Sequence, residues 1–213
     1  MWLDCGPGSL ANLQRHVSLT DLSAIVVSHS HPDHWSDAAS AHVALRYFFE
    51  REHIPVFGTS DTRERLAVAR GDDLAPTFDW HDITDGSRFT IDGLRFMCSR
   101  TDHPVETMAM RIENGDDRSL VYSADTGSGW SLTALPHEAD LVLCEAGALP
   151  AHEGLAPHLS PRQAGAEARA ARAKRLIVTH LPPGADRDSV QRQAEDAFGA
   201  EVEMAATDAS YAV

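Results

Sequence analysis

Cysteine is scarce in this chain, and its spacing excludes two classes of small protein. The sequence has 213 residues and only three cysteines, Cys5, Cys98 and Cys144, and none of them belongs to a C-x-x-C pair. An odd number of widely separated cysteines indicates neither a disulfide framework nor a structural zinc site built from thiolates.

Long apolar runs and linkers are missing as well. No stretch approaches the roughly 20 apolar residues that a membrane-spanning helix needs. Residues 1–5 include no basic segment followed by an apolar run, so they do not resemble a signal peptide. We therefore expect a cytoplasmic protein that does not bind a membrane. Because no repeat, low-complexity tract or Pro/Gly/Ser-rich segment divides the chain, we predict a single domain over residues 1–213.

Positive charge is in short supply. The 18 Lys and Arg residues face 32 Asp and Glu residues, which gives a formal net charge of -14, and Lys174 is the only lysine. Binding to a polyphosphate backbone depends on basic side chains that release condensed counterions. We therefore do not expect a nucleic-acid partner. A hydrophobic share of 43% and a charged share of 23% are typical of a folded protein and exclude general disorder.

Apolar runs alternate with helical patterns near both ends of the sequence, whereas the middle has hairpin signals at Asp92-Gly93 and Asn114-Gly115. The predicted strands are 24–28, 54–58, 89–91, 94–99, 108–113, 119–123, 141–144, 176–179 and a final pair within 202–213. The predicted helices are 36–51, 60–70 with Ser60 or Asp61 as N-cap, 160–174 and 187–198. Mixed sheets with flanking helices favour a layered α/β sandwich over a purely parallel sheet.

Residues 29–34, with the sequence H-S-H-P-D-H, place four candidate metal ligands directly after the first predicted strand. His29 and His31 point to the same side of an extended segment, whereas Asp33 and His34 lie where the chain turns toward the next helix. One loop can therefore serve two cations. Imidazole and carboxylate ligands suit Zn²⁺, Mn²⁺ or Fe in a catalytic site. Burying four such groups without a cation would be costly, which favours metal binding over a structural role.

Three further candidate ligands stand alone, each at the end of a predicted strand. They are His103, Asp125 and His180. Side chains from the ends of several strands meet in one crevice of an open α/β sheet, so together they would complete two coordination spheres. Other histidines are given no role, because a single histidine is usually a surface or capping residue. They are His16, His42, His53, His81, His137 and His152.

The order of these residues resembles the motifs of the metallo-β-lactamase superfamily. The shared positions are Asp4-Cys5-Gly6, residues 29–34, His103, S-A-D-T-G at 123–127 and Thr179-His180. The segments P-H-L-S-P-R-Q-A at 157–164 and L-C-E-A at 143–146 resemble the ribonuclease Z-like phosphodiesterase branch, which includes cyclic-nucleotide phosphodiesterases. The resemblance implies a four-layer αββα sandwich with two divalent metal ions, zinc being expected and manganese or iron being the other options.

The resemblance also implies a set of metal ligands. One ion would be bound by His29, His31 and His103, the other by Asp33, His34 and His180, and Asp125 would bridge the two. Asp4 would orient a ligand histidine, although a turn-forming role before Gly6 is equally open.

The catalytic roles implied by the resemblance fall to three residues. A hydroxide that bridges the two ions would attack a phosphodiester, and Asp33 would orient it or accept its proton. His158 would stabilise the developing charge or protonate the leaving oxygen, and Glu145 would hold His158 in position.

The substrate that we expect is a small phosphodiester, such as a cyclic nucleotide. Asp125 follows His103 by 22 positions (125 − 103), which leaves no room for the long arm of the transfer-RNA-processing members. The residues that follow His180, L-P-P-G-A-D, also depart from those members. Three alternatives stay open: a ribonuclease Z-like transfer RNA endonuclease, a lactone or thioester hydrolase, and a non-catalytic metal-binding module.

The beginning of the sequence differs from the family pattern. Family members usually have an opening strand pair of about 25–30 residues before the strand that leads to Asp4, a length that suits a hairpin. Here that strand begins almost at Met1, so we expect the sandwich to lack the opening pair. An uncovered sheet edge invites association, and a homodimer is one way to cover it.

Overall fold

The computed structural model describes residues 1–136 and 138–213, so His137 lies outside the described residues. The chain divides into two compact units, residues 1–84 and residues 85–213, and each unit has one β-sheet. The prediction of a single domain therefore stays a prediction. In the described part of the chain, every helix is too short or too polar to cross a membrane.

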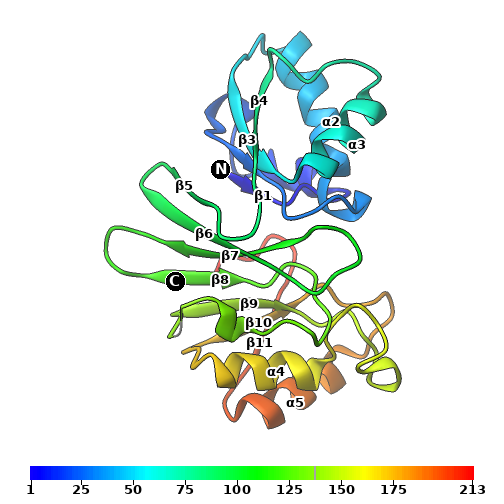
Figure 1. The fold of residues 1–213 in the computed structure, drawn as a ribbon, viewed down its shortest axis with the longest axis vertical. Helices are drawn as coiled ribbons and strands as arrows, with labels where there is room; N and C mark the ends of the chain where they lie inside the picture. The colour runs from blue at the N-terminus through cyan, green and yellow to red at the C-terminus, as the bar shows by residue number, and fades with distance from the viewer. Residues whose placement is uncertain (137) are drawn as a thin grey trace. The chain divides into compact units, whose positions relative to one another are not determined.

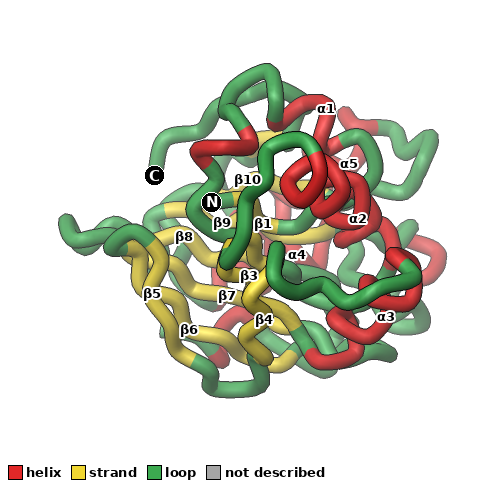
Figure 2. Tube along the Cα trace, turned by 90° about the horizontal axis from the view of Figure 1, so that it is seen from above, coloured by secondary structure: helices red, strands yellow, loops and turns green. Residues whose placement is uncertain are grey.

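The first unit is built on a four-stranded parallel sheet. Its strands, in spatial order, are β1 (Trp2–Leu3), β2 (Ile25–Val26), β3 (Ile54–Gly58) and β4 (Phe78–Asp82). Its helices are α1 (Ser9–Leu13), the short 3-10 helix η1 (Leu19–Asp21), α2 (Pro32–Tyr47) and α3 (Ser60–Arg70). The helices α2 and α3 lie side by side (Figures 1 and 2). Residues 24–30 are fully buried, as expected for a parallel strand that is covered on both faces.

Two helix starts in the first unit differ from the prediction. Helix α2 begins at Pro32 instead of residue 36, because the fixed φ of proline suits the first helical position, where no backbone N–H is needed. Helix α3 is capped by Thr59 instead of Ser60 or Asp61. The Thr59 hydroxyl accepts a hydrogen bond from the Thr62 backbone N–H at 3.3 Å.

The second unit is built on a seven-stranded mixed sheet in the order β11-β10-β9-β8-β7-β6-β5. The strands are β5 (Arg88–Ile91), β6 (Leu94–Arg100), β7 (Met108–Glu113), β8 (Ser119–Tyr122), β9 (Leu141–Glu145), β10 (Leu176–Thr179) and β11 (Glu203–Met204). Strands β5 to β8 are antiparallel neighbours, and β8 to β11 run parallel. Both predicted hairpins are confirmed. The predicted pair within 202–213 is wrong, because the described residues there form only β11, which pairs with β10.

Helices α4 (Pro161–Ala170) and α5 (Arg187–Phe198) complete the second unit, together with the 3-10 helices η2 (Leu132–Ala134) and η3 (Pro150–His152). The two long helices pack against each other below β9 and β10 in Figure 1. Gly165 allows this close approach, since a Cβ there would lie 2.3 Å from the Ala194 carbonyl oxygen. Helix α4 ends at Ala170, short of the predicted 174, and Arg172 then takes a left-handed φ of 54°.

Candidate functional site

The four predicted ligands at 29–34 gather in the first unit, between the end of β2 and the first turn of α2. His29 Nε2 lies 3.1 Å from His31 Nδ1, and the ring centroids of His29 and His34 are 4.1 Å apart. His34 Nε2 lies 3.7 Å from Asp33 Oδ2. His29 and His34 are buried, whereas Asp33 has 58% of its side chain exposed. The loop therefore presents three imidazoles and one accessible carboxylate together.

Asp4 supports this first cluster from the end of β1. Its Oδ2 accepts hydrogen bonds from His34 Nδ1 and the Ser28 hydroxyl, both at 2.8 Å, and its Oδ1 accepts one from the Ser28 backbone N–H at 2.7 Å. A carboxylate that accepts from Nδ1 fixes the imidazole tautomer in which Nε2 can act as a ligand atom. Gly6 brings the two segments close, because a Cβ there would lie 2.0 Å from the Asp33 carbonyl oxygen.

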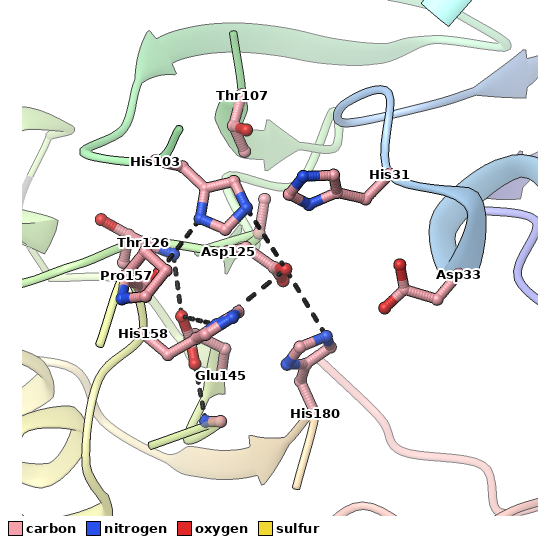
Figure 3. Close-up of polar contacts among 12 residues, drawn as sticks. His31, Asp33, His103, Thr107, Asp125, Thr126, Glu145, Pro157, His158 and His180 are labelled. Carbon is pink, nitrogen blue, oxygen red and sulfur yellow. Dashed lines mark hydrogen bonds and ion pairs between the residues drawn. The ribbon is translucent and has the colours of Figure 1, made fainter. Parts of the chain in front are cut away.

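A second cluster lies in the second unit, beyond the ends of β6, β8, β9 and β10 (Figure 3). His180 Nε2 lies 3.5 Å from Asp125 Oδ2, and His103 Nε2 lies 3.9 Å from the same oxygen. His158 Nδ1 is 4.0 Å from that oxygen. Only 3% of the Asp125 side chain is exposed. Asp125, His158 and His180 offer ligand atoms that all lie within 4.8 Å of one another, which is compact enough to hold a metal ion.

Hydrogen bonds orient two of the rings in this second cluster. His103 Nδ1 donates to the Pro157 carbonyl oxygen at 3.0 Å, so its Nε2 faces Asp125. His158 Nδ1 donates to Glu145 Oε1 at 3.1 Å. Glu145 is 1% exposed and also accepts from the Thr126 N–H at 2.8 Å and the Gly147 N–H at 2.7 Å. The predicted partner of His158, Glu145, is thus fixed in the protein interior, whereas the His158 side chain stays 23% exposed.

Sequence reasoning missed a clamp that positions Asp125. The Thr101 hydroxyl donates to the Asp125 carbonyl oxygen at 2.7 Å, and the Gly127 N–H donates to the Asp102 carbonyl oxygen at 2.6 Å. The Gly129 N–H donates to Asp102 Oδ2 at 2.8 Å. A Cβ at either glycine would lie within 2.8 Å of Asp102 Oδ2. Gly127 and Gly129 are the sequence signal that could have indicated this clamp. Their partner Asp102 is more than 20 positions away, so the contact cannot be inferred before the sheet is known.

His42, which was expected to be a surface or capping residue, is instead fully buried, so that prediction is wrong. Its Nε2 donates to the Leu74 carbonyl oxygen at 2.9 Å, and its Nδ1 accepts from Arg70 Nε at 3.0 Å. Burial lowers the pKa of this imidazole, and the nearby Arg70 charge adds to the effect. His16, His53, His81 and His152 are exposed, in line with the prediction.

The donor chemistry of both clusters fits divalent metal ions. The thiols do not compete as ligands, because all three cysteines are buried. Burial raises the pKa of the Cys98 thiol to about 12 and raises those of Cys5 and Cys144 as well. The available donors are therefore imidazole nitrogens and carboxylate oxygens, which Zn²⁺, Mn²⁺ and Fe accept in catalytic sites. Gly147 leaves room for these rings, since a Cβ there would lie 3.0 Å from both His158 and His180.

Comparison with known proteins gives consistent matches. A family model described as a beta-lactamase superfamily domain matches residues 1–181. The uncharacterized protein Rv1339 of Mycobacterium tuberculosis is 33% identical over 222 residues, which cover 99% of this chain and 80% of that protein. The probable metallo-hydrolase YhfI of Bacillus subtilis is 31% identical over 214 residues, which cover 95% of this chain and 84% of YhfI.

Two further matches are a solved structure and the sequence of a ribonuclease Z. The crystal structure of Bacillus subtilis YhfI superposes with a TM-score of 0.84 and 26% sequence identity, covering 96% of this chain and 83% of that one. Ribonuclease Z of Mycobacterium sp. (strain KMS) is 27% identical over 236 residues, which cover 95% of this chain and 82% of the ribonuclease.

Proposed function

Because this chain belongs to the beta-lactamase superfamily of metal-dependent hydrolases, we propose that it cleaves a small phosphodiester, such as a cyclic nucleotide. The family match confirms the predicted superfamily, and the structural match confirms the predicted mixed α/β fold with two sheets. The observation that carries the proposal is the hydrogen bond between His158 Nδ1 and buried Glu145 Oε1, beside Asp125. It orients His158 so that this ring can donate a proton to the leaving oxygen, which accelerates hydrolysis of a phosphodiester.

The metal ligands in this proposal follow the order of motifs in the superfamily. By that order, His29, His31 and His103 would hold one ion, Asp33, His34 and His180 would hold the other, and Asp125 would contribute to both. When bound, two such ions lower the pKa of water and neutralise charge that develops on a phosphoryl group. Zinc is the proposed metal, and manganese or iron would fit the same donors.

Three side chains transfer protons or orient groups in the proposed reaction. The accessible carboxylate of Asp33 orients the attacking water and accepts its proton. His158 donates a proton to the leaving oxygen of the diester. Glu145 fixes the orientation of the His158 ring, and its negative charge compensates positive charge on that ring during the transfer.

The segment between His103 and Asp125 supports a small substrate over transfer RNA. It contains β7, a tight turn and β8, and all of its residues are described. In the turn, the side-chain oxygen of Asn114 accepts from the backbone N–H groups of Asp116 at 2.9 Å and Arg118 at 3.0 Å. The described chain therefore projects no long arm here, and the net charge of -14 opposes a polyanionic partner.

Ribonuclease Z activity is the second candidate, because the Mycobacterium ribonuclease Z matches 95% of this chain at 27% identity. It would use the same ligands and the same His158 and Glu145 pair. A lactone or thioester hydrolase would not require His158, which gives a way to separate it from both phosphodiesterase candidates. A cytoplasmic location and a homodimer stay predictions.

The test compares substrates on the purified full chain supplied with Zn²⁺ or Mn²⁺. The panel contains cyclic AMP, bis(p-nitrophenyl) phosphate, a transfer RNA precursor, a lactone and a thioester. We expect the highest kcat/KM with cyclic AMP, and we expect His158→Ala to lower kcat by about 10²- to 10⁴-fold. His152→Ala is the matched control, because this exposed histidine lies on the same loop outside the cluster.

Two results would contradict the proposal. A higher kcat/KM with the transfer RNA precursor would favour the ribonuclease Z candidate. Lactone or thioester turnover that is indifferent to His158→Ala would place the chain among carboxylic-ester hydrolases.

A further inference from the structure

A cavity of about 320 Å³ lies on the sheet of the second unit. Residues of β5, β6 and β7 line it together with Pro136. Its charged groups come from three arginines and one acid: Arg88, Arg95, Arg111 and Glu113. The volume is at the lower end of the range of small-molecule sites, about 300–1,000 Å³.

Strand register brings these charged side chains to one face. Arg111 on β7 lies opposite Met97 on β6, and Met97 lies opposite Arg88 on β5. Residues that are directly opposite in an antiparallel pair project from the same face of the sheet. Arg95 and Glu113 also lie opposite each other, two positions along the strands from Met97 and Arg111, so they share that face.

The cavity has an excess of positive charge. Glu113 is the only carboxylate among its lining residues, and it accepts from Arg111 Nε at 2.7 Å and Arg95 Nη2 at 3.3 Å. Arg111 is 9% exposed and also donates to the Pro136 carbonyl oxygen at 3.0 Å. Exposed Arg88 has no ion pair within residues 1–136 and 138–213. Three guanidinium groups against one carboxylate leave a formal charge of +2 (3 − 1) in a chain of net charge -14.

This cavity is separate from the second cluster. His103 follows the last residue of β6, Arg100, whereas Arg95 is near the first residue of that strand and pairs with the last residue of β7. Arg95 therefore lies toward the end of β6 that is far from His103, and Arg88 and Arg111 lie beside Met97, in the middle of that strand. The lining residues of the cavity include no histidine or cysteine, so the side chains there suit binding and not metal-dependent hydrolysis.

We propose that this arginine cavity is a second ligand site that binds a small molecule through its phosphate group. A guanidinium group offers a planar fork of donors that matches two phosphate oxygens, which an ammonium group does not. The ion pairs with Glu113 hold Arg111 and Arg95 in place before the ligand arrives, and this order reduces the entropy lost on binding. Arg88 does not pair with Glu113, so its guanidinium group adds a further positive charge for the phosphate group.

The experiment titrates the full chain with inorganic pyrophosphate at about 0.15 M ionic strength, where remote charges are screened. Calorimetry measures the affinity, and the Nε–Hε NMR signal of Arg111 reports the location. We expect saturable binding that shifts this signal. Arg88→Gln and Arg95→Gln should each raise the Kd by about tenfold, which is the effect of losing one charge-assisted contact. Arg192→Gln removes the same charge from an exposed position on α5 and should leave the Kd unchanged.

Several outcomes would overturn this assignment. Absence of saturable binding, or an unmoved Arg111 signal at saturation, would exclude the cavity as a phosphate site. Equal affinities of Arg88→Gln, Arg95→Gln and Arg192→Gln would place the pyrophosphate elsewhere. Citrate serves as a carboxylate probe, and binding of citrate as tight as that of pyrophosphate would contradict the assignment to phosphate.

Discussion

The two clusters of candidate ligands are built in different ways. The cluster in the first unit comes from one short segment, residues 29–34, which joins β2 to α2. The cluster in the second unit comes from the ends of three strands and the segment before α4, and His103, Asp125 and His180 are each separated by more than 20 residues. One short segment therefore supplies all ligands of the first cluster, whereas the ligands of the second meet only after the sheet has formed.

In both clusters, the supporting carboxylates are distant in sequence from the groups to which they bond. In the first cluster, the Asp4 carboxylate accepts hydrogen bonds from both the Ser28 hydroxyl and His34 Nδ1. In the second cluster, Glu145 and Asp102 each tie together segments that are distant in sequence. We therefore expect the first cluster to be sensitive to loss of the Asp4 carboxylate, and the second to the packing of its loops.

The largest effect is expected from Asp125→Ala in the second cluster. Asp125 lies within 4.0 Å of His103, His158 and His180, so its loss should release metal and lower turnover by at least about 10³-fold. Metal content and kcat/KM measure the two losses, with Asp116→Ala on the exposed β7–β8 turn as the control. His158→Ala should keep its metal. Equal metal loss in Asp125→Ala and His158→Ala would refute this division of roles.

Asp4→Asn tests how far the first cluster depends on the Asp4 carboxylate. An amide accepts more weakly than a carboxylate from His34 Nδ1 and the Ser28 hydroxyl, so we expect metal affinity to fall by about 10- to 100-fold. Competition with a chelator of known affinity measures the change. Asp21→Asn is the control, since Asp21 is exposed on η1. An unchanged affinity in Asp4→Asn would show that the first cluster does not depend on this carboxylate.

Gly129→Ala tests the packing that supports the second cluster. The new Cβ would lie 2.5 Å from Asp102 Oδ2, and we expect the free energy of unfolding to fall by about 1–3 kcal/mol. Urea denaturation measures the change. Gly115→Ala is a matched control because nothing lies within 4 Å of a Cβ there. Equal stability of the two variants would argue against the clamp.

His42 gives the smallest effect, a pH dependence of stability in the first unit. Burial lowers the pKa of its imidazole, so below about pH 6.5 the unfolded chain binds a proton that the folded chain does not. Its contribution to stability is thus present above that pH and is lost as the pH falls, by at most about 1.4 kcal/mol per pH unit. Urea denaturation at several pH values should give a flatter profile for His42→Gln than for the exposed control His81→Gln. Identical profiles would exclude His42 as a source of acid sensitivity.

Local signals predicted a large part of the fold. Strand β3 and helix α5 match the predicted residues, and the turns at Asp92-Gly93 and Asn114-Gly115 form hairpins. The left-handed φ values of Asp92 and Gly93 explain why this dipeptide is a strong turn signal. These features depend on residues that are close in sequence, so a single sequence contains the information.

Features that depend on distant partners could not be predicted. Strand β4, with the sequence F-D-W-H-D, was missed because its polar residues lack the apolar pattern of a buried strand, and its pairing with β3 depends on a distant segment. Asp102 bonds to Gly129, and Arg88 shares a face with Arg111, only through the register of the second sheet. The choice of Thr59 as cap among three adjacent polar residues likewise depends on where β3 ends.

Metal content per chain tests the central claim most directly, namely that both clusters take part in binding divalent metal ions. Mass spectrometry of the metals in the dialysed full chain should give two divalent ions per chain, and His31→Ala and His180→Ala should each lower that number. A chain that binds no metal, or that keeps both ions when either histidine is replaced, would contradict the account.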